Sequence, residues 1–204
     1  MPQAVSCDTY YPQLAHDDQM HETSDTLTPY YRLDPEELIQ VIESTGLLCD
    51  GRLLALNSYE NRVYQVGIED AEPLITKVYR PGRWTDEQIL EEHTFALEIA
   101  DAEIPLIPPM EINGKTLHEF DGFRFAMFER RGGHAPELDQ KDTRLWLGRF
   151  LGRIHAVGAA SAFTARPELT IASFGHESVQ ELLEGQWLPP HLETAFSSLA
   201  TDLL

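Results

Sequence analysis

The chain has 204 residues, of which 42% are hydrophobic and 24% charged, a composition typical of a folded globular protein and not of a disordered one. Its 15 basic and 34 acidic residues give a formal net charge of −19, which repels nucleic acid and anionic membrane surfaces. The two cysteines are widely spaced, so the sequence predicts no disulfide framework. No apolar run approaches the roughly 20 residues of a membrane span, so no membrane partner is expected. The sequence predicts a cytoplasmic location.

The first part of the chain lacks the signals of a folded element. Residues 1–31 contain no Lys or Arg and no periodic apolar pattern, which predicts a flexible acidic extension. A short helix is expected next, because Asp34 can cap it, Pro35 suits its first position and Gly46 can end it.

The middle of the chain has the pattern of an antiparallel sheet. Alternating segments at 52–56, 62–66 and 74–79 predict three strands, and residues 85–100 predict a helix with Thr85 and Gln88 as a capping box. Turn signals at 113–114 and 121–122 predict two hairpins, followed by a last strand at 123–128. The expected fold class is α+β, a mostly antiparallel sheet of five or more strands with one helix inserted after the third.

Beyond residue 132 the pattern becomes helical. Residues 142–157 and 191–204 each carry an apolar stripe, and Gly148 and Gly152 predict close packing of the first helix against a neighbour. His155 is expected to be a hydrogen-bonded core histidine. The last helix has no capping signal, which indicates a chain cut inside a domain or, equally, a fraying natural end. We expect an extension at 1–31, a mixed lobe at 32–131 and an incomplete helical lobe at 132–204.

Lys77 is one of three lysines and lies within an apolar strand, where an unpaired ammonium costs several kcal/mol on an order-of-magnitude estimate. Glu92 is its expected partner, because it shares a helical stripe with apolar residues, whereas Glu91 is expected to be solvated. A strand lysine paired with a helix glutamate is typical of a kinase nucleotide site. The alternatives are a lysine whose ammonium reaches water and an ordinary surface glutamate.

The loop at residues 57–61 is the second part of this candidate site. Aligned with the kinase pattern Gly-x-Gly-x-x-Gly-x-Val, it places Leu56, Ser58, Asn61 and Val63 at the four fixed positions, with no glycine. Ser58 could donate to a phosphate and Asn61 could adopt a left-handed conformation. A plain polar hairpin is the alternative.

Residues 127–133 form the third part, because they connect the last strand to the helical region. In a two-lobed kinase this connection is the hinge, where backbone groups of Phe128 and Glu129 would meet adenine, and Gly132 and Gly133 would permit movement. The alternative is an ordinary loop.

Three motifs, at residues 56–65, 77–84 and 88–93, together resemble the bacterial stress response kinase A family, and the likeness extends from about Asp34 to the last residue. The resemblance implies a protein-kinase-like fold of the aminoglycoside phosphotransferase type, and an ATP- and magnesium-dependent serine/threonine protein kinase of the cytoplasm. By position, Ser58 matches the family's phosphate-loop serine, Lys77 its nucleotide lysine and, less firmly, Glu92 the partner of that lysine.

The chain departs from the family in one respect: it contains no His-Gly-Asp segment, and no counterpart of the metal-binding Asn and Asp. We therefore expect no catalytic residue and no metal ligand here, and no measurable kinase activity of this polypeptide alone. Two other functions remain open. One is a small-molecule alcohol kinase of the aminoglycoside or choline kinase type, and the other is a non-catalytic module that binds a nucleotide, or a partner through Leu192, Phe196, Leu199 and Leu203.

Overall fold

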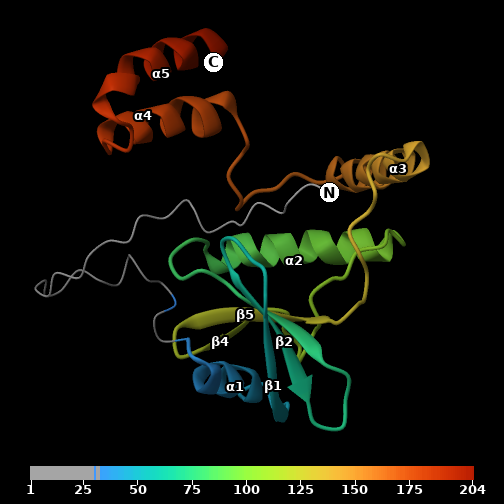
Figure 1. The fold of residues 1–204 in the computed structure, drawn as a ribbon. Helices are drawn as coiled ribbons and strands as arrows, with labels where there is room; N and C mark the ends of the chain where they lie inside the picture. Colours follow the sequence, from blue (N-terminus) through green and yellow to red (C-terminus); the bar gives the residue numbers. More distant parts are fainter. Residues whose placement is uncertain (1–29, 31–32) are drawn as a thin grey trace, which may run out of the picture.

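The computed structural model describes residue 30 and residues 33–204, and is built around one five-stranded antiparallel sheet of order β1-β2-β3-β5-β4 (Figure 1). The strands are β1 (Cys49–Leu56), β2 (Arg62–Ile68), β3 (Leu74–Val78), β4 (His118–Phe120) and β5 (Phe123–Glu129). The helices are α1 (Pro35–Glu43), α2 (Asp86–Asp101), α3 (Lys141–Gly158), the π-helical turn η2 (Ala172–His176), α4 (Glu177–Glu184) and α5 (Pro190–Leu203). The expected sheet, with one helix inserted after its third strand, is confirmed.

The two expected turns have the backbone that tight hairpins require. Asn113 and Gly114 have φ of 54° and 74°, and Asp121 and Gly122 have φ of 45° and 82°. Two consecutive left-handed residues match the right-handed twist of the flanking strands. The second turn joins β4 to β5, whereas the first is closed by a single bridge between Ile112 and Lys115.

Strand alternation gives the sheet two different faces. On β3, Thr76 and Val78 are buried on the face that packs on α1, and Lys77 points to the opposite face, which α2 covers. The α1 face holds the larger core, made of Leu38, Val41, Ile42, Val66, Ile68, Val78, Phe123, Phe125 and Met127. Each such side chain contributes about 1.5–3 kcal/mol when fully buried, so this face stabilises the sheet without using the polar residues opposite.

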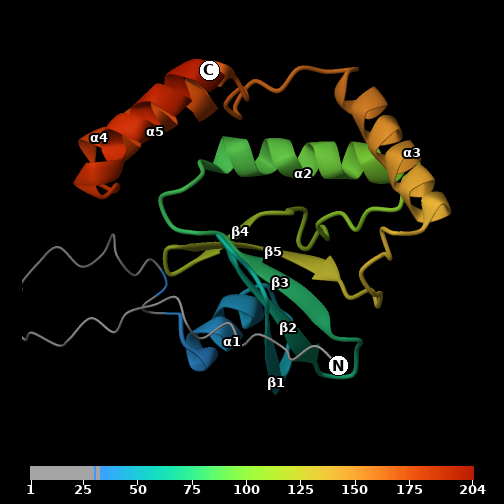
Figure 2. The ribbon, with the colours of Figure 1, turned by 45° about the horizontal axis from the view of Figure 1, so that its top comes forward.

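Helix α2 begins as its sequence predicts. The Thr85 hydroxyl accepts from the N–H of Gln88, and the Gln88 side chain accepts from the N–H of Thr85. Its buried side chains are Ile89, His93 and Ile99. Figures 1 and 2 show α2 lying across the sheet, between the strands and the later helices.

The helical region packs more loosely than expected. Helices α3, α4 and α5 bury no residue completely, and α4 and α5 lie side by side in Figure 2. A Cβ at Gly148 or Gly152 would meet open space, so the close packing expected there is wrong. His155 is exposed, so its expected core role is wrong as well. The turn η2 was not predicted, because Ser173 and Gly175 are weak helix formers. Helix α4 was not predicted either, although its Glu, Gln and Leu residues favour a helix.

Most of the expected extension, residues 1–29 and 31, lies outside the described residues. Tyr30 is described, and it is partly buried against the sheet. Its hydroxyl donates to the carbonyl of Glu60 at 3.0 Å, and the Arg62 guanidinium lies over its ring at 5.1 Å. Burial raises the pKa of Tyr30 to about 12, so its hydroxyl keeps its proton as a donor at neutral pH.

Candidate functional site

The lysine and glutamate that the sequence pairs are in contact. The Nζ atom of Lys77 on β3 lies 2.9 Å from Oε1 of Glu92 on α2, and the two side chains are 22% and 37% exposed. The ammonium also lies over the Tyr79 ring, 4.6 Å from its centre. Lys77 is therefore not a lysine directed to water, and Glu92, although partly exposed, differs from an ordinary surface glutamate in being paired with it.

A second cation binds the same carboxylate. Arg166, in the segment between α3 and η2, donates from its guanidinium to Oε2 of Glu92. Burial alone would raise the pKa of Glu92, but the hydrogen bond and charge of Lys77 and the charge of Arg166 outweigh it and lower that pKa below the usual value. Glu92 is thus ionised at neutral pH, with one cation on each oxygen.

Arg166 is fixed by more than its ion pair. Its Nε donates to the carbonyl of Gln88 at 3.1 Å, and its guanidinium lies over the Trp84 ring at 4.4 Å from the centre. Gln88 in turn donates from Nε2 to the carbonyl of Ala165 at 3.0 Å. A planar guanidinium can make these contacts together because its donors form a rigid fork.

Glu91, expected to be solvated, instead binds the backbone of the segment that carries Arg166. Its carboxylate accepts from the N–H groups of Thr164, Ala165 and Arg166, the last at 2.7 Å. These backbone hydrogen bonds lower the pKa of Glu91 to about 2. We call residues 164–166 the clasp, because the adjacent Glu91 and Glu92 of α2 hold them from 73 to 75 positions away.

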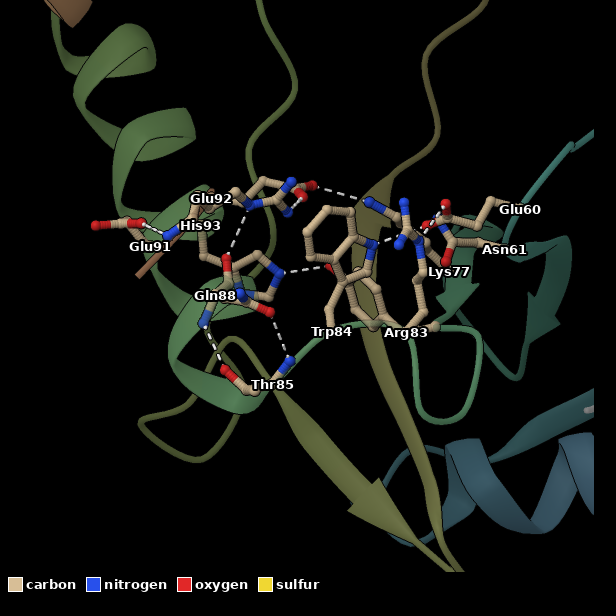
Figure 3. Close-up of polar contacts among 12 residues, drawn as sticks. Glu60, Asn61, Lys77, Arg83, Trp84, Thr85, Gln88, Glu91, Glu92 and His93 are labelled. Atoms are coloured by element: carbon tan, nitrogen blue, oxygen red, sulfur yellow. Dashed lines mark hydrogen bonds and ion pairs between the residues drawn. The ribbon is translucent and has the colours of Figure 1, made fainter. Parts of the chain in front are cut away.

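The loop between β1 and β2 joins the same group through Glu60. Trp84 donates from Nε1 to Oε1 of Glu60 at 2.8 Å, and Arg83 donates from Nε to Oε2 at 3.1 Å. Figure 3 shows Trp84 standing between the α2 residues and Glu60. Burial opposes ionisation of Glu60, but these two donors outweigh it and keep its pKa below the usual value. The loop is therefore tied to the start of α2.

The residues expected in this loop have mixed outcomes. Val63 pairs with Lys77 in the β2–β3 register, so the two share the face that α2 covers. Asn61 is not among the described residues with positive φ, so it does not adopt the left-handed conformation that was open to it. Its Oδ1 accepts from the N–H of Arg80 at 3.2 Å. Ser58 is partly buried in the loop, and its role toward a phosphate stays a prediction.

The two residues of the expected hinge lie on opposite faces. Phe128 packs with Tyr79, Ile89 and Ala126 on the α2 face. Glu129 is the next residue along β5, so its side chain points the other way, where it is exposed and ion-paired with Arg131 at 2.5 Å. Residues 130–140 have no regular helix or strand. A hinge function of this segment stays a prediction.

His93 connects α2 to its surroundings from a fully buried position. Its Nε2 lies 2.7 Å from the Tyr79 hydroxyl and its Nδ1 lies 2.9 Å from Oγ1 of Thr116. Burial lowers the pKa of His93 to about 4, so the ring is neutral at neutral pH. A neutral ring has one N–H donor and one acceptor nitrogen, and both nitrogens have a partner here, so His93 supports the structure of α2 and its surroundings.

Sequence reasoning missed Arg166, Glu60 and the role of Glu91. Arg166 lies in a stretch without regular periodicity, and nothing in its neighbourhood marks it as a ligand of α2. Only the three-dimensional placement of the clasp brings it to Glu92. Among the residues that the structure describes, no group of three His, Cys, Asp or Glu could hold a metal ion. In the same part of the chain, no helix is both long and apolar enough to cross a membrane.

Comparison with known proteins gives this geometry a family. Residues 52–196 match the model of the phosphotransferase enzyme family. The chain is 39% identical over 181 residues to the serine/threonine protein kinase RdoA of Salmonella typhimurium, covering 89% of this chain and 55% of the relative. It is 38% identical over 175 residues to stress response kinase A of Escherichia coli K12, covering 86% and 53%. The chain thus spans about half the length of these relatives.

A solved structure of similar fold is the amicoumacin kinase hAmiN in complex with AMP-PNP, Ca2+ and Ami, with a TM-score of 0.58 at 17% identity. The match covers 83% of this chain and 57% of that structure. At that identity the likeness shows the fold alone, and it confirms the expected protein-kinase-like architecture. The resemblance to stress response kinase A drawn from the three motifs is also confirmed. This chain belongs to the phosphotransferase enzyme family.

Proposed function

We propose that the chain carries the nucleotide-binding part of a phosphotransferase and binds the phosphates of ATP at Lys77. The observation that carries this proposal is the 2.9 Å contact between Lys77 and Glu92 across the β3–α2 interface. In kinases a strand lysine held by a helix glutamate binds the nucleotide phosphates.

Local charge supports the proposal against the charge of the whole chain. The chain carries −19, which repels a triphosphate, whereas the charges of the site balance, since Lys77, Arg83 and Arg166 offset Glu60, Glu91 and Glu92. The Lys77 ammonium lies on the α2 face of the sheet, which Val63 and Phe128 also line. An apolar surface beside a cation suits a nucleotide, whose base is planar and whose phosphates are anionic.

Titration of the chain with a fluorescent ATP analogue tests the proposal. Lys77→Ala should weaken binding about tenfold or more, because a charge-assisted contact to phosphate is lost. Lys141→Ala is the matched control, since Lys141 begins α3 and is exposed. Equal affinity of the Lys77→Ala variant and the parent chain would refute the assignment.

Among the described residues, no group of three His, Cys, Asp or Glu could hold a metal ion, and the sequence has no counterpart of the family's metal-binding Asn and Asp. The relative named a serine/threonine protein kinase favours a protein acceptor for the complete enzyme, and the fold neighbour that binds Ami keeps a small-molecule acceptor as the second candidate. A cytoplasmic location is part of the same proposal.

For this polypeptide we propose nucleotide binding without phosphoryl transfer, because it has no His-Gly-Asp segment to orient an acceptor hydroxyl. Incubation with radiolabelled ATP, a basic protein substrate and an aminoglycoside should label neither acceptor. Labelling of the protein or of the aminoglycoside by this chain would show that the transfer machinery lies within these 204 residues.

A further inference from the structure

We propose that Arg166 is a positioning residue for the nucleotide site, one that holds Glu92 and the loop between β1 and β2 in register with Lys77. The inference rests on the proposed nucleotide site and adds a residue that lies 74 positions from Glu92.

The Glu92 carboxylate binds a different cation with each of its two oxygens. Lys77 occupies Oε1 and Arg166 occupies Oε2, so the two cations fix both the position and the rotation of the carboxylate. Without Arg166, the second oxygen of a half-buried carboxylate would lack its ionic partner. The carboxylate could then turn, and Lys77 would be its only cation and less free to meet a phosphate.

Arg166 is also linked, through Trp84, to the loop between β1 and β2. The guanidinium lies over the Trp84 ring, and the Trp84 indole N–H donates to Glu60 in the loop. Glu60 also accepts from Arg83, whose guanidinium lies 4.6 Å from the centre of the Trp84 ring. The indole is therefore held between two cations, and Arg166 contacts both the helix that carries Glu92 and the residue that holds the loop.

The backbone around Arg166 is held by contacts that do not involve the Arg166 side chain. Glu91 accepts from three consecutive backbone N–H groups of the clasp, and Gln88 donates back to the carbonyl of Ala165. The backbone position of Arg166 is thus set by contacts that do not involve its guanidinium. This arrangement suits a group whose task is to place another side chain.

The contacts of Arg166 depend on the planar shape of its guanidinium as well as on its charge. Arg166 donates from Nε to the carbonyl of Gln88 and from a terminal nitrogen to Glu92, two directions that a planar fork provides together. A lysine at this place carries the same charge on a single nitrogen and cannot reproduce both contacts with the stacking on Trp84. A conservative variant therefore distinguishes a positioning role from a general electrostatic one.

The experiment measures the affinity of the 204-residue chain for a fluorescent ATP analogue. Arg166→Gln should weaken binding about tenfold, and Arg166→Lys should weaken it nearly as much. Arg153→Gln is the matched control, because Arg153 also joins the helical region to α2, through the carbonyls of Ala102 and Glu103, but far from Glu92. This control should bind like the parent chain.

A double-mutant cycle shows whether Arg166 acts through Glu92. In a Glu92→Gln background the Arg166→Gln change should cost less than in the parent chain, because the carboxylate that it positions is gone and only its contact with Trp84 remains to be lost. Undiminished loss in that background, full affinity of Arg166→Lys, or an equal loss in Arg153→Gln would each overturn the proposal. If Arg166→Gln does not fold, Arg166→Lys carries the same comparison.

Lys77→Ala separates this inference from the proposed function. If that variant binds like the parent chain, the nucleotide site itself is wrongly assigned. If it loses binding while both Arg166 variants retain it, only the positioning role fails. A second readout needs no nucleotide: in a Trp146→Phe, Trp187→Phe background, Trp84 is the single tryptophan, and Arg166→Gln should shift its emission whereas Arg153→Gln should not.

Discussion

Glu91 and Glu92 are adjacent on α2, yet their carboxylates hold different kinds of partner: Glu91 accepts from backbone N–H groups of the clasp, and Glu92 pairs with the side chains of Lys77 and Arg166. Successive helical residues point about 100° apart, so the two carboxylates approach the clasp and the strand from different sides. One short piece of α2 thereby joins the sheet to a distant segment.

Glu91→Ala should release the clasp. Three backbone donors would lose their acceptor, so the amides of residues 164–166 should exchange hydrogen faster at neutral pH. Hydrogen exchange with mass spectrometry measures this directly. Glu98→Ala is the control, because Glu98 lies on the same helix and is exposed. Unchanged protection of the clasp in the Glu91→Ala chain would contradict this role.

The same contact predicts a dependence on acid. The pKa of Glu91 is about 2 in the folded chain, against an ordinary value of 4.5, so its stabilising effect is complete above pH 4.5 and is lost as pH falls toward 2. Exchange protection of residues 164–166 should fall through that range in the parent chain. In the Glu91→Ala chain it should be low throughout, and an equal fall in both chains would count against Glu91.

His93 predicts a second pH effect at milder acidity. Its pKa is about 4 when folded and 6.5 when unfolded, so the unfolded chain binds the proton first and stability falls as pH drops from 6.5 to 4. The loss should reach about 3 kcal/mol in free energy of unfolding, from about 2.5 pKa units. Urea denaturation at several pH values should show it, and His93→Gln should flatten the curve. His155→Gln, at an exposed site, should not.

Thr76→Val should stabilise the sheet. The Thr76 hydroxyl on β3 is fully buried and has no hydrogen-bond partner among the described residues. Valine has the same shape without the polar atom, so the free energy of unfolding should rise by about 1 kcal/mol. Thr45→Val is the control with the opposite sign, because the buried Thr45 hydroxyl donates to the carbonyl of Ile42 at 2.7 Å. A destabilised Thr76→Val chain would show that the hydroxyl has a partner.

Gly67→Ala should destabilise the β1–β2 pair through Asp50. A Cβ at Gly67 would clash with the carboxylate of Asp50, whose Oδ1 accepts from the N–H of Arg52 at 2.9 Å. Moving the Asp50 carboxylate breaks that contact, so we expect a loss of about 1 kcal/mol in thermal or urea unfolding. Gly133→Ala meets no atom and serves as control. In an Asp50→Ala background the cost of Gly67→Ala should disappear.

The sheet and half of the site could be predicted from local sequence patterns. The partners Lys77 and Glu92 could be predicted because strand alternation and helical periodicity each fix the direction of a side chain. Arg166 could not, since a loop residue has no periodicity and its place depends on how the chain returns to α2. The prediction that Glu91 is solvated was wrong for a related reason, because its acceptor role depends on backbone donors of that returning segment.

The two contacts of Glu92 also differ in when they can form. Lys77 precedes Glu92 by 15 positions and Arg166 follows it by 74, so the first closes at a lower entropic cost. At about 5–20 residues per second of synthesis, the clasp leaves the ribosome roughly 4–15 s after α2. We therefore expect the site to form in sequence during synthesis, with the Lys77–Glu92 pair first and Arg166 last.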